Sequence, residues 1–269
     1  MPTRTGIFSS FFKDMTIVDP LLRSEQKVIM AMDNTVDNVF TGSFNVTITA
    51  LYYNDHETLT PADAILPIST RSSGQNASSA MSLPDGNGTV FLTFPRNVGR
   101  AVVSILASGN SAEEFWYTNL PTEYDDTFNN TAIYGYSAFR EVQLLIDGEL
   151  AGVSWPFPIV FTGGISPGLW VPIVGIDVYD LPSFEIDISP WLGILCDGKS
   201  HKFQLRVVGY DSETGLGTVG SNWWVTGSVF VWADEKGHQT IGTVSPGLSF
   251  ECSGPAANQL IIACSVSRF

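Results

Sequence analysis

The stretch SFEIDIS, residues 183–189, decides the fold class of this chain. Its apolar residues alternate with Glu185 and Asp187, so the apolar side chains and the carboxylates point to opposite sides. Alternation with a period of two is typical of a β-strand that covers a core with one face. We therefore expect both carboxylates on the solvated face of a strand.

Strand signals of this kind recur along the chain, and helical periodicity is nearly absent. The unequal loops between them favour a jelly-roll (Greek-key) β-sandwich, an all-β fold with long loops and little helix. SPWLG (189–193) is the exception and predicts a single helical turn. Residues 71–88 and 122–130 are expected to be exposed loops. The further strand segments are KVIMAM (27–32), SFNVTITALYY (43–53), TVFLTF (89–94), RAVVSILAS (100–108), REVQLLID (140–147), HKFQLRVVG (201–209) and WVTGSVFVWA (224–233).

The composition is that of a folded, turn-rich and acidic protein. Of 269 residues, 44% are apolar and 15% charged, with 25 Gly and 15 Pro. The formal net charge of −14 would repel phosphate backbones and anionic membranes, so we expect neither nucleic acid nor membrane as a partner.

Four N-x-S/T sequons favour a secreted or vacuolar/lumenal protein that carries glycans. No secretory signal sequence opens the chain, so we expect its start to lie inside a longer precursor. The alternative is an intracellular chain with unused sequons. The sequons are at Asn45, Asn76, Asn87 and Asn129.

The cysteines fit an oxidised protein, although they do not require one. Cys252 and Cys264 flank a turn between two short apolar runs, so a disulfide that closes a hairpin is expected there. Cys196 has no partner in view. Three reduced, buried thiols are the alternative.

The sequence lacks the residues that several familiar catalytic sites require. GISPG (164–168) matches the G-x-S-x-G elbow of serine hydrolases, but Pro167 has no N–H to give to an oxyanion hole. The scattered histidines and the absence of C-x-x-C argue against zinc. No phosphate-binding or dinucleotide-binding glycine loop is present. Calcium stays open at two acidic pairs without a loop signature, namely Asp125 and Asp126, and Asp177 and Asp180.

The segment SAEEFWYTNLP (111–121) places two carboxylates beside three aromatic residues. Carboxylates among aromatic rings suit sugars, which stack on the rings and hydrogen-bond to polar groups. If the segment is a strand, the spacing favours Glu114 over Glu113 as the residue that shares a face with Trp116. If it is a loop, that argument does not apply.

Several motifs resemble the acid peptide:N-glycosidase A family, the secreted plant and fungal glycoamidases, also called peptide-N4-(N-acetyl-β-glucosaminyl)asparagine amidases A. They are EEFWYTN, FREV, WPFP, TGG and DLPSFEID, in this order, within a resemblance that covers roughly residues 13–237. The resemblance implies a jelly-roll fold, no cofactor, and hydrolysis of the amide between asparagine and the first N-acetylglucosamine of an N-glycan. No metal-binding residues are assigned. Glycopeptides or glycoproteins would be the substrates, with a second domain or subunit of the same precursor as a further partner.

Hydrolysis of an amide requires an activated water and protonation of the leaving nitrogen, which two carboxyl groups can share. We expect Glu114 and Glu141 to be this pair, with Glu113 in reserve. Arg140 would bind the scissile carbonyl or a glycan oxygen. Trp116 would stack on the first two sugars, and the other expected substrate-binding residues are Trp155 and Trp170.

Two departures from the family pattern qualify the resemblance. Ala112 stands where relatives usually carry cysteine, and relatives are about twice as long, so we expect a truncated member. From the resemblance we also expect a fungal member. Residues 1–237 would form the jelly roll, and residues 238–269 a connection or the start of a second domain. A glycan-binding or structural sandwich without activity is the main alternative. A polymer-cleaving glycosidase is a third interpretation, because two carboxylates also serve that reaction.

Overall fold

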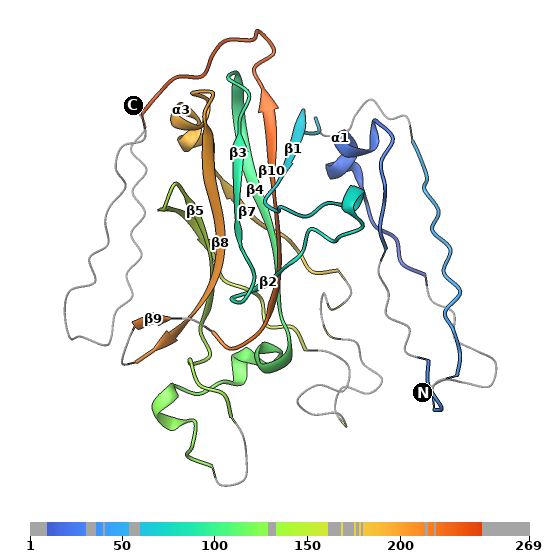
Figure 1. Cartoon of the computed structure of the whole chain (residues 1–269), viewed down its shortest axis with the longest axis vertical. Helices are drawn as coiled ribbons and strands as arrows, with labels where there is room; N and C mark the ends of the chain where they lie inside the picture. The colour runs from blue at the N-terminus through green and yellow to red at the C-terminus, as the bar shows by residue number, and fades with distance from the viewer. Residues whose placement is uncertain are drawn as a thin grey trace.

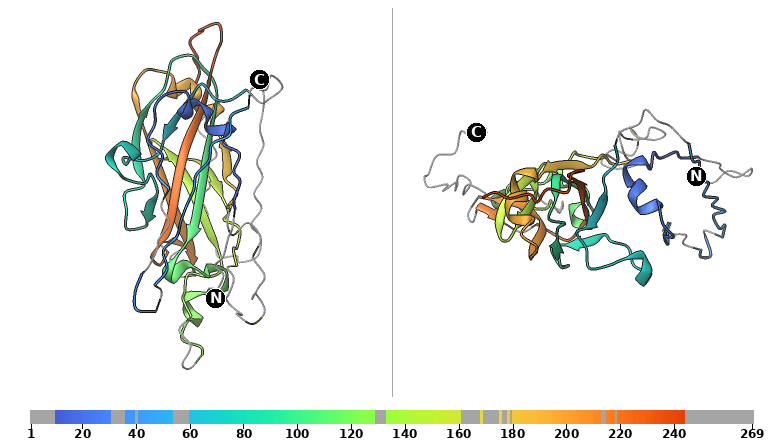
Figure 2. Two further views of the ribbon diagram at one scale, coloured as in Figure 1. Left: turned by 90° about the vertical axis from the view of Figure 1, so that its right-hand side faces the viewer. Right: turned by 90° about the horizontal axis from the view of Figure 1, so that it is seen from above.

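Two antiparallel sheets pack against each other and form the body of the protein (Figure 1). They are seen in a computed structural model, which describes residues 10–30, 36–39, 41–53, 60–128, 133–160, 168, 175, 178, 180–212, 215–217 and 219–243. Figure 2 shows that the described residues between 10 and 53 lie to one side of the sandwich. No helix within these ranges is long and apolar enough to cross a membrane.

The first sheet, sheet A, has the strand order β1-β10-β4-β7, and β2 also pairs with β10. The second, sheet B, has the order β3-β8-β5-β6, and β9 also pairs with β8. The strands of sheet A are β1 (Ala64–Pro67), β2 (Met81–Leu83), β4 (Val98–Gly109), β7 (Phe184–Asp187) and β10 (Trp223–Ala233). Those of sheet B are β3 (Thr89–Thr93), β5 (Arg140–Ile146), β6 (Glu149–Ser154), β8 (Ser200–Asp211) and β9 (Gly215–Gly217).

The pairing of the strands identifies the fold. When the short strands β2 and β9 are set aside, the first strand pairs with the last, β3 with β8, β4 with β7 and β5 with β6. Every pair is antiparallel, so the chain is one long hairpin rolled into two four-stranded sheets. This nesting defines a jelly roll, and the predicted fold class is confirmed.

Each sheet turns one row of side chains into a shared core. From sheet A, β4 contributes Ala101, Val103 and Ile105, and their exposed fraction is 0%. From sheet B, the alternate residues of β5 are equally buried, namely Val142, Leu144 and Ile146. Each large aliphatic side chain buried in this way stabilises the fold by about 1.5–3 kcal/mol.

The alternation in SFEIDIS has the expected consequence. Ile186 packs against the core, whereas Glu185 and Asp187 are exposed on the outer face of sheet A. SPWLG forms the helical turn η6 (Ser189–Trp191), which continues into α3 (Leu192–Leu195). Both predictions are confirmed.

The N-terminal strand predictions are wrong. Residues 43–53 and 27–30 are exposed and lie outside both sheets, and residues 31–32 are outside the described ranges. A β-prone pattern becomes a strand only where a sheet edge accepts its backbone groups. This part of the chain instead contains the helical turns η1 (Thr16–Val18) and α1 (Asp19–Leu22).

The polar segment 71–88 is a loop in most of its length, as expected, with the turn η2 (Ser73–Gln75) inside it. Residues 81–83 depart from this expectation, because they form β2, which pairs with the start of β10. The buried Met81 and Leu83 explain the difference, because they face the core in an otherwise polar stretch.

A buried histidine holds two carboxylates together at the end of the sandwich where β5 finishes. His201 Nδ1 lies 2.6 Å from Asp147 Oδ2, and its Nε2 lies 3.2 Å from Asp197 Oδ1. Burial lowers the pKa of His201, but the hydrogen bonds and charges of the two aspartates outweigh burial, so the pKa is raised. The pKa of Asp197 is lowered to about 2, first by the backbone N–H of Lys199.

Candidate functional site

At the other end of the sandwich, β4 runs into the segment SAEEFWYTNLP. This segment forms 3-10 turns, η3 (Ser111–Glu113) and η4 (Trp116–Thr118), followed by η5 (Thr122–Tyr124). The strand argument for the direction of the two glutamates therefore does not apply. Gly109 permits the turn, because a Cβ there would lie 2.3 Å from the carbonyl oxygen of Glu113. The Asn110 side chain caps η3 by accepting from the Ser111 N–H at 2.8 Å.

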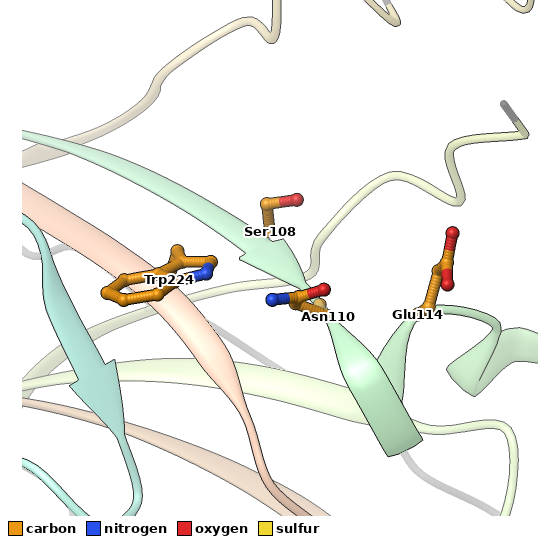
Figure 3. Close-up of a pocket in the computed structure, with 5 residues that line it drawn as sticks. Ser108, Asn110, Glu114 and Trp224 are labelled. Carbon is orange, nitrogen blue, oxygen red and sulfur yellow. The ribbon is translucent and has the colours of Figure 1, made fainter. Parts of the chain in front are cut away.

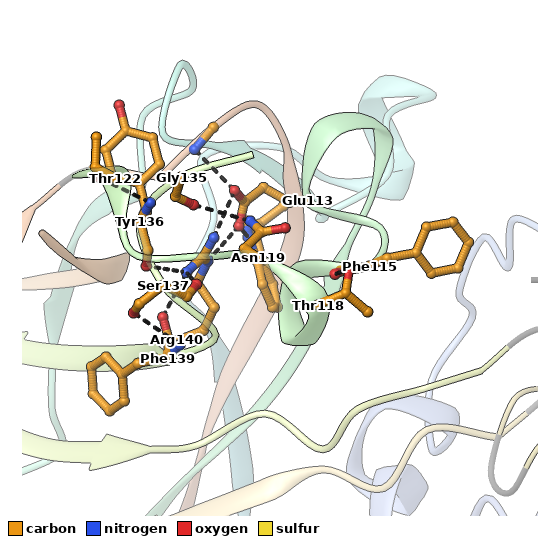
Figure 4. Close-up of polar contacts among 12 residues, drawn as sticks. Glu113, Phe115, Thr118, Asn119, Thr122, Gly135, Tyr136, Ser137, Phe139 and Arg140 are labelled. Carbon is orange, nitrogen blue, oxygen red and sulfur yellow. Dashed lines mark hydrogen bonds and ion pairs between the residues drawn. The ribbon is translucent and has the colours of Figure 1, made fainter. Parts of the chain in front are cut away.

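A buried ion pair holds this turn against the sandwich (Figure 4). Arg140 donates from Nε to Glu113 Oε2 at 2.5 Å and from Nη2 to Oε1 at 3.0 Å. The Trp223 indole N–H and the Gly220 backbone N–H donate to the same carboxylate at 2.8 and 3.0 Å. One carboxylate thus accepts from four donors and joins η3 to the starts of β5 and β10.

The role expected for Arg140 needs correction. Its side chain is 0% exposed, and Nη1 donates to the backbone carbonyls of Tyr136, Ser137 and Phe139. A guanidinium enclosed in this way does not reach a substrate carbonyl or a glycan oxygen. Glu113 is enclosed as well, at 1% exposed, so the geometry gives it a structural role in place of the expected reserve catalytic role.

The next residue, Glu114, faces an open hollow of about 350 Å³ (Figure 3). Its other lining residues are Ser108, Gly109, Asn110 and Trp224. Trp224 lies on the outer face of sheet A, opposite Ser108 on β4, and is 45% exposed. A carboxylate, an amide, a hydroxyl and an uncovered indole therefore surround one space.

A second and much smaller hollow, of about 10 Å³, adjoins the first and shares Ser108, Gly109 and Glu114 with it. Its wall is aromatic, with Trp116, Trp223 and Phe157, and it also includes Pro156 and Ile159. The structure thus brings Glu114 and Trp116 together. Trp116 is only 8% exposed and its ring centroid lies 6.1 Å from that of Trp223, so it offers little open surface on which a sugar could stack.

Tyr117 packs edge-on against Trp116, with their ring centroids 5.6 Å apart. Its hydroxyl donates to the carbonyl of Ile159 at 2.8 Å, which ties η4 to the segment after β6. Burial raises the pKa of Tyr117, and the negative charge of Glu114 adds to this effect. The phenol therefore stays protonated and keeps its hydrogen bond.

Glu141 lies apart from Glu114. It follows Arg140 on β5 and points to the outer face of sheet B, where Trp155 Nε1 donates to its Oε2 at 3.1 Å. Gln143 Nε2 donates to Oε1 at 2.6 Å. Glu141 lines neither hollow next to Glu114, so the structure does not bring the two expected catalytic carboxylates together.

The remaining expected residues divide into described and undescribed ones. Asn45, Asn76 and Asn87 are exposed, as glycan carriers must be, and Cys196 is buried with a raised pKa because of burial. The residues outside the described ranges are Trp170, Asn129, Cys252 and Cys264, together with Asp177 and most of GISPG.

Sequence reasoning missed Ser108, Asn110 and Phe157, and it did not single out Trp224 from the other tryptophans. Asn110 carried a usable signal, because an asparagine after a strand-ending glycine is a typical cap. Trp224 and Ser108 carried none, because their meeting depends on the register between β4 and β10.

The fold and the site together define the class of this protein, a jelly roll with an open hollow lined by a carboxylate and an indole ring. Side chains of these kinds suit the binding of sugars. The chain belongs to the family described as peptide N-acetyl-beta-D-glucosaminyl asparaginase amidase A, which matches residues 1–248.

One relative is the peptide-N4-(N-acetyl-beta-glucosaminyl)asparagine amidase A of Prunus dulcis, which is 36% identical over 261 residues. The match covers 91% of this chain and 44% of that protein, so the chain spans less than half the length of this relative. The fungal origin expected for the chain stays a prediction.

Solved structures show weaker likeness. PNGF-II is 14% identical with a TM-score of 0.38, and the match covers 68% of this chain and 32% of that one. PNGase F of Flavobacterium meningosepticum, a glycosylasparaginase, is 11% identical with a TM-score of 0.36, over 65% of this chain and 54% of that one.

Proposed function

We propose that this protein is a peptide:N-glycosidase, which hydrolyses the amide between asparagine and the first sugar of an N-glycan. The products would be a glycosylamine and a peptide with aspartate in place of asparagine. Family membership supports the reaction, and the observation that carries it is the open carboxylate of Glu114 beside Trp224 and Asn110.

In this proposal Glu114 acts on the reacting groups. A carboxylate activates the attacking water or, when protonated, gives a proton to the leaving nitrogen. Trp224 would stack on a sugar ring, and Asn110 and Ser108 would hydrogen-bond to hydroxyl or acetamido groups. Of the residues that line the two hollows, Glu114 is the one carboxylate, so its acid or base partner would come from elsewhere in the protein.

The bridge between Glu113 and Arg140 would serve the reaction indirectly. Glu114 is held at the hollow because its neighbour is fixed by four hydrogen bonds. Side chains that position a reacting group contribute to the rate by keeping it in a productive geometry. Glu113 and Arg140 are therefore positioning residues in this account.

We also propose that the protein works in a secretory, vacuolar or extracellular compartment. The observations in favour are the sequons, with Asn45, Asn76 and Asn87 all exposed. N-glycosylated peptides are the proposed partners.

The test is incubation of a denatured glycopeptide at mildly acid pH with the 269-residue chain. A chimera would be run in parallel, in which the part of the almond amidase beyond the matched region is fused to this chain. Release of the intact glycan with conversion of asparagine to aspartate supports the proposal, and activity of the chimera alone means that this chain supplies part of the site. No release by either protein contradicts the proposal.

The rival function is glycan binding without hydrolysis. It needs Trp224 and Asn110 but not the carboxylate of Glu114. Binding of glycopeptides that stays intact over long incubation, in the chain and in the chimera, would favour it.

A further inference from the structure

The outer face of sheet B carries an ordered chain of polar side chains that the hollow at Glu114 does not include. Trp155 Nε1 donates to Glu141, whose other oxygen accepts from Gln143 Nε2 at 2.6 Å. Gln143 Oε1 in turn accepts from Arg206 Nε at 2.5 Å. Four side chains from three neighbouring segments are thus linked in one line.

The strand pairing fixes where this line lies. Gln143 pairs with Arg206 across β5 and β8, and with Val153 across β5 and β6. On β5, Val142 and Leu144 point into the core, so Glu141 and Gln143 point outward. The line therefore crosses the outer face of sheet B, whereas Trp224 lies on the outer face of sheet A.

Burial along the line is uneven. Gln143 is 3% exposed in the middle, whereas the Trp155 ring at one end is 51% exposed and the Arg206 side chain at the other end is exposed. A buried amide with both of its polar atoms bonded holds its neighbours in fixed geometry. The Trp155 indole is consequently fixed by its N–H while half of its surface stays open to solvent.

The chemistry that this arrangement would recognise is that of a pyranose ring. The open indole offers an apolar, electron-rich surface to the C–H groups of the sugar. Arg206 uses only Nε within the described part of the chain, so both of its terminal nitrogens can donate to sugar hydroxyl or acetamido oxygens. A purely apolar partner would bury these two terminal nitrogens without an acceptor.

We propose that Trp155 and Arg206 form a second saccharide-binding platform on the outer face of sheet B, with Glu141 and Gln143 as its positioning residues. The choice of a β-linked N-acetylglucosamine unit as ligand rests on the proposed function. The platform itself rests on the geometry of the four side chains. The next residues along the chain, Pro156 and Phe157, line the second, smaller hollow, which shares Glu114 with the first, so the Trp155 end of the platform lies near the candidate site.

The test measures binding of N,N′-diacetylchitobiose by calorimetry, without any hydrolysis. All proteins carry Trp224→Ala, which removes the open indole of the hollow. In this background the sugar is expected to bind, and Trp155→Ala is expected to weaken binding at least about tenfold. The matched control is Phe91→Ala, which removes another exposed aromatic from the same face and is expected to change the affinity less than about twofold.

The positioning role has its own readout. Glu141→Ala is expected to weaken binding when Trp155 is present, and to have no further effect in Trp155→Phe, which lacks the indole N–H. Thermal unfolding of every variant confirms that it is folded.

Three results would each overturn the proposal. They are unchanged affinity in Trp155→Ala, no binding in the Trp224→Ala background, and an effect of Glu141→Ala on affinity that is the same with Trp155 as in Trp155→Phe. None of these results bears on amide hydrolysis, which is assayed separately. Loss of hydrolysis in the presence of normal sugar binding would contradict the proposed function and leave the platform standing.

Discussion

Replacement of Glu113 by glutamine tests the buried bridge that underlies the site. The amide keeps the shape of the side chain but exchanges one acceptor oxygen for an NH2 donor. If Oε2 is replaced, Arg140 Nε and Trp223 Nε1 lose their acceptor, and if Oε1 is replaced, Arg140 Nη2 and the Gly220 N–H lose theirs. Two buried donors are left unpaired in either case.

The magnitude follows from this count. An unsatisfied buried donor costs about 1–3 kcal/mol, so two cost about 2–6 kcal/mol. Removal of one partner from a buried ion pair costs about 3–5 kcal/mol by comparison, and the two ranges overlap. In a domain of this size 1 kcal/mol lowers Tm by about 2–4 °C, so Glu113→Gln is expected to lower it by about 6–20 °C.

The assay is urea unfolding followed by tryptophan fluorescence, with thermal unfolding as a second measurement. The matched control is Glu114→Gln, the same exchange one residue further on, where the carboxylate faces the hollow. Its effect is expected to stay within about 0.5 kcal/mol. A free energy of unfolding for Glu113→Gln within about 1 kcal/mol of this control would refute the reasoning, because removal of one charge from an enclosed ion pair is expected to destabilise the protein by more than that.

Three further predictions concern other parts of the chain. The pKa of His201 is raised in the folded protein, so its protonation adds to the free energy of unfolding. This stabilisation is fully present below the unfolded pKa of about 6.5 and is lost as pH rises through the folded pKa. His201→Gln is therefore expected to destabilise the protein more at pH 5 than at pH 8, and equal losses in chemical denaturation would contradict this. Gly109→Ala forces a Cβ against a backbone carbonyl and is expected to cost about 1–3 kcal/mol, whereas Gly99→Ala on the same strand, with its nearest contact at 3.9 Å, should cost less. Equal costs would refute that contrast. Expression in a secretory host is expected to yield glycans at Asn76 and Asn87, which mass spectrometry of the peptides detects, and unmodified asparagine at both would contradict the proposed compartment.

The regular part of the fold was predictable because each core strand carries its own signal. The alternation in SFEIDIS and the apolar runs of β4, β5, β8 and β10 indicate which residues are buried, and this signal does not depend on which strand pairs with them. The same signal misled at residues 43–53, because local β-propensity does not say whether a sheet edge will be present. Short strands such as β2 and β9 have too few residues to show a period.

The sequence directed attention to the segment that borders the hollow, whereas the contacts of its individual residues were not predictable. The family motif and the mixture of carboxylates and aromatics pointed to residues 111–121, where Glu114 lies at the hollow. Glu113 is buried whereas Glu114 faces the hollow, and this difference depends on the partners of Glu113. These partners are 27, 107 and 110 residues away in sequence, namely Arg140, Gly220 and Trp223. Contacts over such separations are set by strand register, which no local pattern encodes.

The central claim is that the carboxylate of Glu114 takes part in the hydrolysis of the glycan amide. The most direct measurement compares release of an N-glycan from a denatured glycopeptide by the active form, chain or chimera, with and without Glu114→Gln. The account predicts that asparagine is converted to aspartate and that Glu114→Gln slows this at least about 100-fold while the protein stays folded. Release at the unmodified rate by Glu114→Gln, or a cut that leaves a sugar on the asparagine, would contradict it.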